Sequence, residues 1–225
     1  MRYNMFNQIH KALRVLMYDT GVLLSQTDFD IPQEADPVSE RLNQLLDIFE
    51  RHAEHEDRMV LPLLQDYEPG VVEAFAQQHV TDHALIQRLK GFLMALECAI
   101  SSEAKKELGA SLTSAYIEFM IFNLQHMQKE ETLLNKMLWR YYSDEELAGV
   151  NQKIVSSIPV DEAAVASQWM MKGLSNNEIT TWLRTMERNA PEPVFRSLFT
   201  TAEKELDPKR FRLILEGLTE GIMTA

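Results

Sequence analysis

The sequence predicts an all-α protein, an up-down four-helix bundle with a helical extension at its C-terminal end. Apolar residues recur at spacings of three and four through most of the 225 residues, and no long alternating stretch indicates β-strands. Glycine and proline are few, with 8 of each, whereas residues that favour helices are common. We predict that residues 1–142 form the bundle and that residues 143–225 form the extension, whose role the sequence leaves open.

The first two helices of the bundle are predicted from an apolar stripe, a proline-containing loop and a proline near the end of the second helix. The first helix covers about residues 5–24. Its apolar stripe consists of Phe6, Ile9, Leu13, Met17 and Leu24. Residues 27–38 contain two prolines and predict a loop, after which Ser39 opens the second helix. Pro62 should kink or end this helix, because proline has no N–H for the helical hydrogen bond.

The second half of the bundle follows a turn at residues 68–70, where the sequence is Glu-Pro-Gly. The third helix then covers about residues 71–101, and the polar residues 101–106 predict a connection. The fourth helix covers about residues 108–142, with Leu133 on its inward stripe. Beyond it the predicted helices are short. They are punctuated by prolines and by two sequences of capping-box form, Ser143-x-x-Glu146 and Ser175-x-x-Glu178.

The net charge, the cysteine count and the absence of long apolar runs exclude several classes of partner and site. The formal net charge is -12, so phosphate backbones would be repelled and we expect no nucleic-acid partner. One cysteine excludes an intramolecular disulfide and a cysteine-rich metal site. No long uncharged apolar run and no signal-peptide core occur, which predicts a cytoplasmic protein without a membrane partner.

The histidines are the main candidates for chemistry. All six lie within the first 126 residues, and each falls inside a predicted long helix. Residues four apart on a helix are separated by only about 40° around its axis, so they can hold one ion between them. Three such pairs occur on the second, third and fourth helices: His52 with Glu56, His79 with His83, and His126 with Glu130. His10 is the single histidine of the first helix.

These polar side chains continue the apolar stripes of their helices, so we expect them to point into the core. Burying them without partners would cost roughly 1–3 kcal/mol for each group, a cost that a metal centre offsets. Seven imidazole and carboxylate candidates exceed the ligands of one tetrahedral zinc ion. They fit two six-coordinate ions that share bridging carboxylates, and this ligand type suits iron, manganese or zinc.

The arrangement resembles the hemerythrin HHE cation-binding domain. Residues 51–62, Arg-His-Ala-Glu-His-Glu-Asp-Arg-Met-Val-Leu-Pro, are similar to the second-helix motif of that family, and residues 78–85 resemble its third-helix motif. The match covers roughly residues 5–140. The resemblance implies two iron ions, Fe2+ or Fe3+, with a bridging oxo or hydroxo group, while zinc or manganese would also suit these ligands. The implied ligands are His10, His52, Glu56, His79, His83, His126 and Glu130.

Two neighbouring residues have open roles. Glu131 would lie about 140° from His126 unless a π-bulge intervenes, so geometry favours Glu130 as the ligand. His55 lies three residues after His52 on nearly the same face. It could line the pocket of a small ligand, hydrogen-bond to a metal ligand, replace another ligand, or only pack.

Three functions fit such a centre. The first is a di-iron protein that binds or senses oxygen, nitric oxide or peroxide, with the C-terminal helices reporting the change. The second is an enzyme for peroxide or nitric oxide detoxification or for iron-centre repair, with His55 as a candidate proton donor. The third is a helical interaction module that zinc or manganese stabilises. The sequence does not decide whether the chain is an enzyme, and a homodimer through the C-terminal helices is a further hypothesis.

Overall fold

The computed structural model describes residues 2–223, and within them it confirms the all-α class: helices are present and no strand is. The chain divides into two units. The first consists of Met1–Phe6 and Leu16–Ser156, and the second of Asn7–Val15 and Ser157–Ala225. These units differ from the predicted division after residue 142, because helix α6 (Asp144–Ser157) lies almost wholly in the first unit and the beginning of α1 lies in the second.

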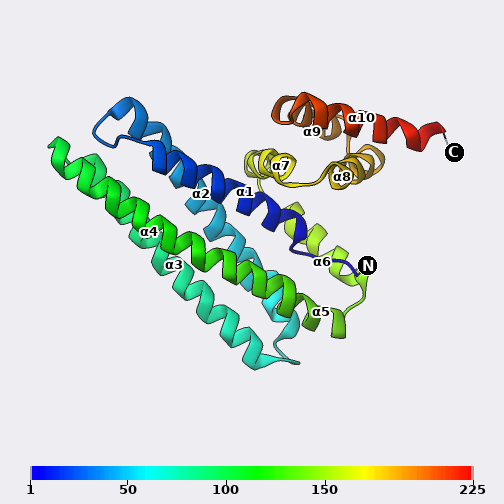
Figure 1. The fold of residues 1–225 in the computed structure, drawn as a ribbon. Coiled ribbons are helices and arrows are strands. Elements are labelled where there is room, and N and C mark those ends of the chain that lie inside the picture. Colours follow the sequence, from blue (N-terminus) through cyan, green and yellow to red (C-terminus); the bar gives the residue numbers. More distant parts are fainter. Residues whose placement is uncertain (1, 224–225) are drawn as a thin grey trace. The chain divides into compact units, whose positions relative to one another are not determined.

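The first unit is a bundle of long helices that run side by side (Figure 1). They are the later part of α1 (Asn7–Gln26), α2 (Pro32–His55), α3 (Pro69–Cys98) and α4 (Ser102–Lys129). Helix α3 packs along α4 and along α2. The hydroxyl of Tyr116 on α4 donates to the carbonyl of Met17 on α1 at 2.7 Å. The buried interior includes Leu42, Leu45, Phe49, Ile86, Leu89, Leu112 and Phe119.

Two boundaries of the bundle were predicted wrongly. Residues 27–38 are not all loop, because α2 begins at Pro32 and includes Pro37. Proline is favourable at the first helical position, where its missing N–H has no partner in the helix. Helix α4 begins at Ser102 rather than near residue 108, since the hydroxyl of Ser101 caps it by accepting from the N–H of Ala104 at 3.2 Å.

Helices α2 and α4 both leave α-helical geometry at a glutamate. Helix α2 passes into a π-helix, η1 (Glu56–Val60), and a 3-10 helix, η2 (Leu61–Leu64). Helix α4 passes into a π-helix, η3 (Glu130–Leu134), and then α5 (Asn135–Tyr141). A π-turn holds one residue more than an α-turn and moves the buried stripe along by one. Leu134 is therefore buried, whereas Leu133, which was predicted to point inward, is 42% exposed.

The second unit combines residues 7–15 with four short helices. They are α7 (Val160–Gly173), α8 (Asn176–Asn189), α9 (Glu192–Glu205) and α10 (Pro208–Met223). Helix α7 packs against α9, and α8 packs against α10. Their shared core contains Met171, Leu174, Ile179, Leu183, Leu198, Ala202, Leu206 and Ile214. The predicted capping box of Ser175 and Glu178 is confirmed at the start of α8.

A 16-residue repeat runs through the C-terminal helices. Helices α6 to α10 begin at residues 144, 160, 176, 192 and 208. The fourth residue of each helix is apolar: Leu147, Ala163, Ile179, Phe195 and Phe211. The seventh is also apolar: Val150, Ala166, Trp182, Leu198 and Ile214. Each repeat is thus one helix with a two-residue connection, a periodicity that our sequence analysis missed.

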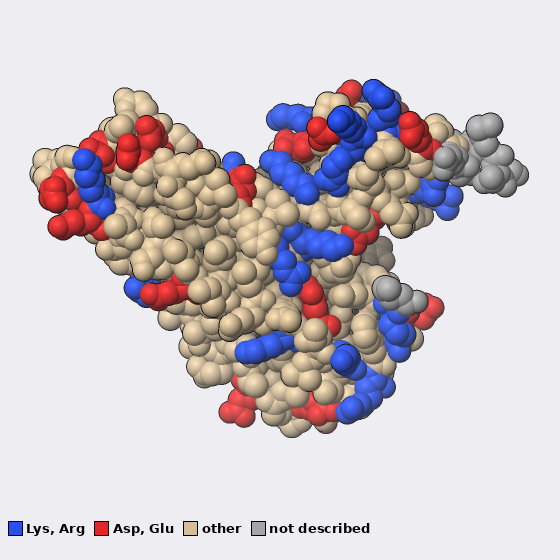
Figure 2. Space-filling model, in the orientation of Figure 1, with Lys and Arg blue, Asp and Glu red and all other residues tan. Residues whose placement is uncertain are grey.

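The surface carries mixed charge. Figure 2 shows basic and acidic side chains interspersed over the second unit, and a broad uncharged area over the bundle in this view. Exposed apolar side chains on α1 and α4 include Tyr18, Val22, Ile117 and Ile121. Within residues 2–223, no helix has the length and apolar character needed to cross a membrane.

Candidate metal centre

Two groups of side chains in the described part of the chain bring their donor atoms within 4.8 Å of one another, as metal ligands would. The first group consists of Glu56, His79, His126 and Glu130. The second consists, within the first unit, of His52 and the same Glu56 and Glu130. The same two glutamates belong to both groups, so the arrangement offers two adjacent positions with shared carboxylates.

The first group has distances that suit one ion. His126 Nε2 lies 3.0 Å from Glu130 Oε1, and His79 Nε2 lies 3.4 Å from Glu56 Oε2 and 4.0 Å from Glu130 Oε1. The Nε2 atoms of the two histidines are 3.2 Å apart. With metal–ligand bonds of about 2.1 Å, octahedral donors are about 3.0 Å apart when adjacent and about 4.2 Å when opposite. The donor atoms therefore lie where an ion could bind all four.

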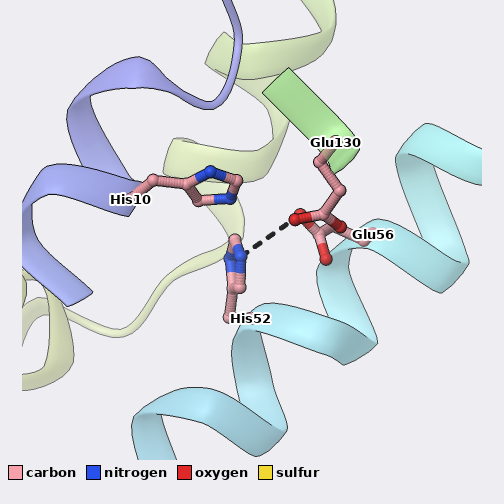
Figure 3. A group of neighbouring side chains, drawn as sticks. All are labelled: His10, His52, Glu56 and Glu130. Carbon is pink, nitrogen blue, oxygen red and sulfur yellow. Dashed lines mark ion pairs between the residues drawn. The ribbon is translucent and has the colours of Figure 1, made fainter. Parts of the chain in front are cut away.

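The second group is drawn in Figure 3, where the imidazole of His52 faces the two carboxylates. His52 Nε2 is 3.2 Å from Glu56 Oε1. His10, the predicted ligand of the first helix, is buried. It stands on the part of α1 that belongs to the second unit. We therefore define the centre by the five candidate ligands of the first unit and keep His10 as a proposed ligand.

Local helix geometry explains how α2 and α4 supply their ligands. His52 with Glu56, and His126 with Glu130, are one α-helical turn apart and share a face of their helices. Each π-turn begins at the glutamate and so leaves this four-residue spacing intact. Glu130 accordingly belongs to both groups, whereas Glu131 is half-buried and lies in neither.

The centre concentrates acidic groups in the interior. Glu56 and Glu130 are 3% and 0% exposed, and a buried carboxylate is costly unless positive charge compensates it. Burial would lower the pKa of His79, but hydrogen bonds and attraction from Glu56 and Asp57 raise it to about 9. The carboxylates thus favour a cation in their midst, supplied by protons on imidazole or by metal ions.

A buried polar pair lies on the α3–α4 side of the first group. Asn123 Nδ2 donates to Asp82 Oδ1 at 2.6 Å, and the two residues are 2% and 4% exposed. Burial raises the pKa of Asp82, while the hydrogen bond from Asn123 and the nearby His126 and His79 oppose that rise. Our sequence analysis did not single out Asp82 as a candidate.

Two hydrogen-bond partners of the ligands were also missed. Asp57 Oδ1 lies 2.6 Å from His79 Nδ1, and Gln78 Oε1 lies 3.4 Å from His126 Nδ1. Asp57 could have been noticed because an acidic residue follows the glutamate in both His-x-x-x-Glu motifs. Gln78 has no comparable signal in the sequence.

Two predicted residues are not brought into these groups. The side chain of His83 is 64% exposed, and its Nδ1 atom is 3.7 Å from Glu50 Oε1. The buried face of α3 runs through His79 and Asp82, and His83 lies about 100° beyond Asp82 around the helix. His55, at the end of α2, is half-buried and belongs to neither group.

The comparison with protein families agrees with this site. A family model described as "Hemerythrin HHE cation binding domain" matches residues 1–138. The chain belongs to this family. The match covers every predicted ligand of the hemerythrin-like part and stops before α6 begins. No curated protein and no solved structure matches the chain. Family membership and the buried histidine and glutamate groups together indicate a metal-binding site.

Proposed function

We propose that this hemerythrin-like protein holds two iron ions and binds or senses oxygen, or a related small molecule such as nitric oxide or peroxide. One observation carries the proposal: within the first unit, a group of four donors and a group of three share the same two buried glutamates. A single ion would use only one of these groups. Two ions would use both and would place most positive charge where the carboxylates are most buried.

The number of donors favours a centre that can accept a further ligand. One ion would be held by His79 and His126, and the other by His52 and, as we propose, by His10, with Glu56 and Glu130 available to both. Iron commonly takes six ligands, so four protein donors leave room for a small molecule, whereas four donors would already satisfy a tetrahedral zinc ion. Iron would supply reversible electron transfer and affinity for oxygen.

Aromatic side chains lie beside one histidine of the centre. The rings of Phe75 and Phe122 flank the imidazole of His126, with centroid distances of 5.9 Å and 6.0 Å. Apolar groups around metal ligands exclude water and lower the local dielectric constant, which strengthens the attraction between ions and carboxylates. The same shielding would favour small uncharged ligands over large or charged ones.

The metal content of protein purified without added metal tests the proposal. We expect close to two iron ions per chain, and an absorption spectrum of the iron-loaded protein that changes when oxygen is added. His79→Ala should lose iron, whereas His83→Ala, on the same helix but exposed, should retain two ions. Zinc as the sole metal, or equal iron content in the two variants, would contradict the proposal. Turnover of peroxide or nitric oxide would indicate the enzyme rather than the sensor.

A further inference from the structure

A half-exposed carboxylate, that of Asp57, is hydrogen-bonded to His79 of the proposed metal centre. The Nδ1 atom of His79 lies 2.6 Å from Oδ1 of Asp57, a distance typical of a short charge-assisted hydrogen bond. The Nε2 atom of the same ring faces the other donors, at 3.4 Å from Glu56 and 3.2 Å from His126 Nε2. The two nitrogens of His79 therefore have different neighbours: a half-exposed carboxylate on one side and the buried centre on the other.

We propose that Asp57 is a positioning residue, which fixes the tautomer and the ring orientation of His79 for metal binding. This inference rests on the proposed metal centre. A carboxylate can only accept a hydrogen bond, so it holds the proton of a neutral imidazole on Nδ1. The lone pair of Nε2 is then available to an ion, and the negative charge of Asp57 makes that nitrogen a stronger donor.

Helix geometry explains why Asp57 can do this without entering the centre. Successive residues in a helix point about 100° apart. Glu56 points inward and its side chain is 4% exposed, while the side chain of Asp57 is 46% exposed. Asp57 reaches across to the ligand-bearing side of α3, and the two consecutive acids thus serve different purposes.

The other histidine of this group, His126, has a weaker hydrogen bond at its Nδ1 atom. His126 Nδ1 is 3.4 Å from Gln78 Oε1, and that oxygen also accepts from Lys129 Nζ at 3.1 Å. The amide of Gln78 is neutral, and it shares its acceptor with a lysine. Hydrogen bonds to a charged acceptor are roughly twice as strong as neutral ones. Of the two histidines, His79 is therefore the more firmly oriented.

The plainer interpretation is that Asp57 is a surface carboxylate with an incidental neighbour. Its place in an internal repeat argues against this interpretation. The motif His52-x-x-x-Glu56-Asp57 matches His126-x-x-x-Glu130-Glu131 in length and in the acid that follows the shared glutamate. Both motifs also pass into a π-helix at the same position. Asp57 therefore belongs to a six-residue motif that occurs twice among the helices of the proposed centre.

Zinc binding by the full-length chain tests the inference, because zinc is diamagnetic and its affinity can be measured by competition with a coloured chelator. Asp57→Leu should lower zinc affinity by about 10–100-fold, the range found when hydrogen-bond partners of metal ligands are removed. Asp57→Asn should lose less, since its amide oxygen still accepts from Nδ1–H. The control is Glu54→Leu, which removes an equal charge from the last turn of α2, just before η1, at a side chain 59% exposed, and it should bind like wild type.

Two further measurements separate positioning from folding. The metal-free Asp57→Leu protein should melt somewhat lower, because it loses the hydrogen bond to protonated His79, but it should keep the helical circular dichroism of the wild type at 25 °C. In the zinc-loaded wild type, NMR should show a slowly exchanging Nδ1–H proton on His79, and Asp57→Leu should lose it. Wild-type zinc affinity in Asp57→Leu, or an unchanged Nδ1–H signal, would overturn the role of Asp57 alone. A wild-type protein that binds neither iron nor zinc would overturn the proposed function itself.

Discussion

Replacing Glu130 with glutamine tests the shared carboxylate directly. Glu130 belongs to both donor groups and is fully buried, so its loss removes one charged donor from each ion. Glu131→Gln is the matched variant, since it makes the same change one residue later at a half-buried side chain in neither group. The two variants decide between the glutamates that the sequence left open.

The expected change in melting temperature follows from the linkage between metal binding and folding. An ion present at 100 times its dissociation constant stabilises the folded chain by about 2.7 kcal/mol, which raises the melting temperature by about 5–11 °C for a chain of this size. Removing a direct ligand should cost at least the upper end of the 10–100-fold loss seen for supporting residues. A 100-fold loss at that metal concentration leaves about 0.4 kcal/mol, or about 1–2 °C.

The assay is thermal unfolding with and without metal, followed by circular dichroism. Glu130→Gln should retain only about 1–2 °C of the metal-induced rise under these conditions, while Glu131→Gln should retain most of it. Both metal-free proteins should be measured too, so that any effect on folding is subtracted. If Glu130→Gln kept the full rise and Glu131→Gln lost it, our assignment of the shared ligand would be refuted.

Three further predictions concern packing and pH. Gly109→Ala should destabilise the chain by about 1–3 kcal/mol despite better helix propensity, because its new Cβ would overlap the ring of Phe29. Gly91→Ala, with no atom within 4 Å, should instead stabilise by about 0.5–1 kcal/mol; urea unfolding measures both. Metal must displace the proton of His79, whose pKa is about 9, so zinc affinity should rise between pH 7 and pH 9 and then level off; a flat profile would contradict this. Burial would raise the pKa of Glu178, but hydrogen bonds from its neighbours lower it to about 2. Its stabilisation should thus be complete above pH 4.5 and lost as the pH falls toward 2, so the stability gap between wild type and Glu178→Gln should close over that range.

The long helices and the α2 and α4 ligand pairs could be predicted because they depend only on local periodicity. Four-residue spacing places His52 beside Glu56 and His126 beside Glu130 wherever those helices pack. The same spacing on α3 did not suffice, since spacing does not state which way the helix is turned. The structure turns α3 so that Asp82, rather than His83, joins His79 on the buried face.

The π-turns and the supporting contacts could not be predicted from spacing. A π-turn is less favourable than an α-turn for an isolated helix, and the gain that stabilises it comes from tertiary contacts. Its effect is visible only in three dimensions, where Leu134 replaces Leu133 in the core. The contact of Asp57 with His79 likewise joins residues 22 apart on different helices.

One helix of the C-terminal repeat is bonded to α1 through its capping glutamate. Glu178, the third residue of α8, caps its own helix and also accepts from Lys11 Nζ at 2.7 Å and from Asn7 Nδ2 at 2.8 Å. The equivalent residue of α6, Glu146, is bonded to Ser143 in a capping box of its own. One repeat thus has an additional task, and the two residues that it binds lie on either side of His10 in α1. Within the second unit, Glu178 therefore ties the start of α8 to the turn of α1 that carries His10.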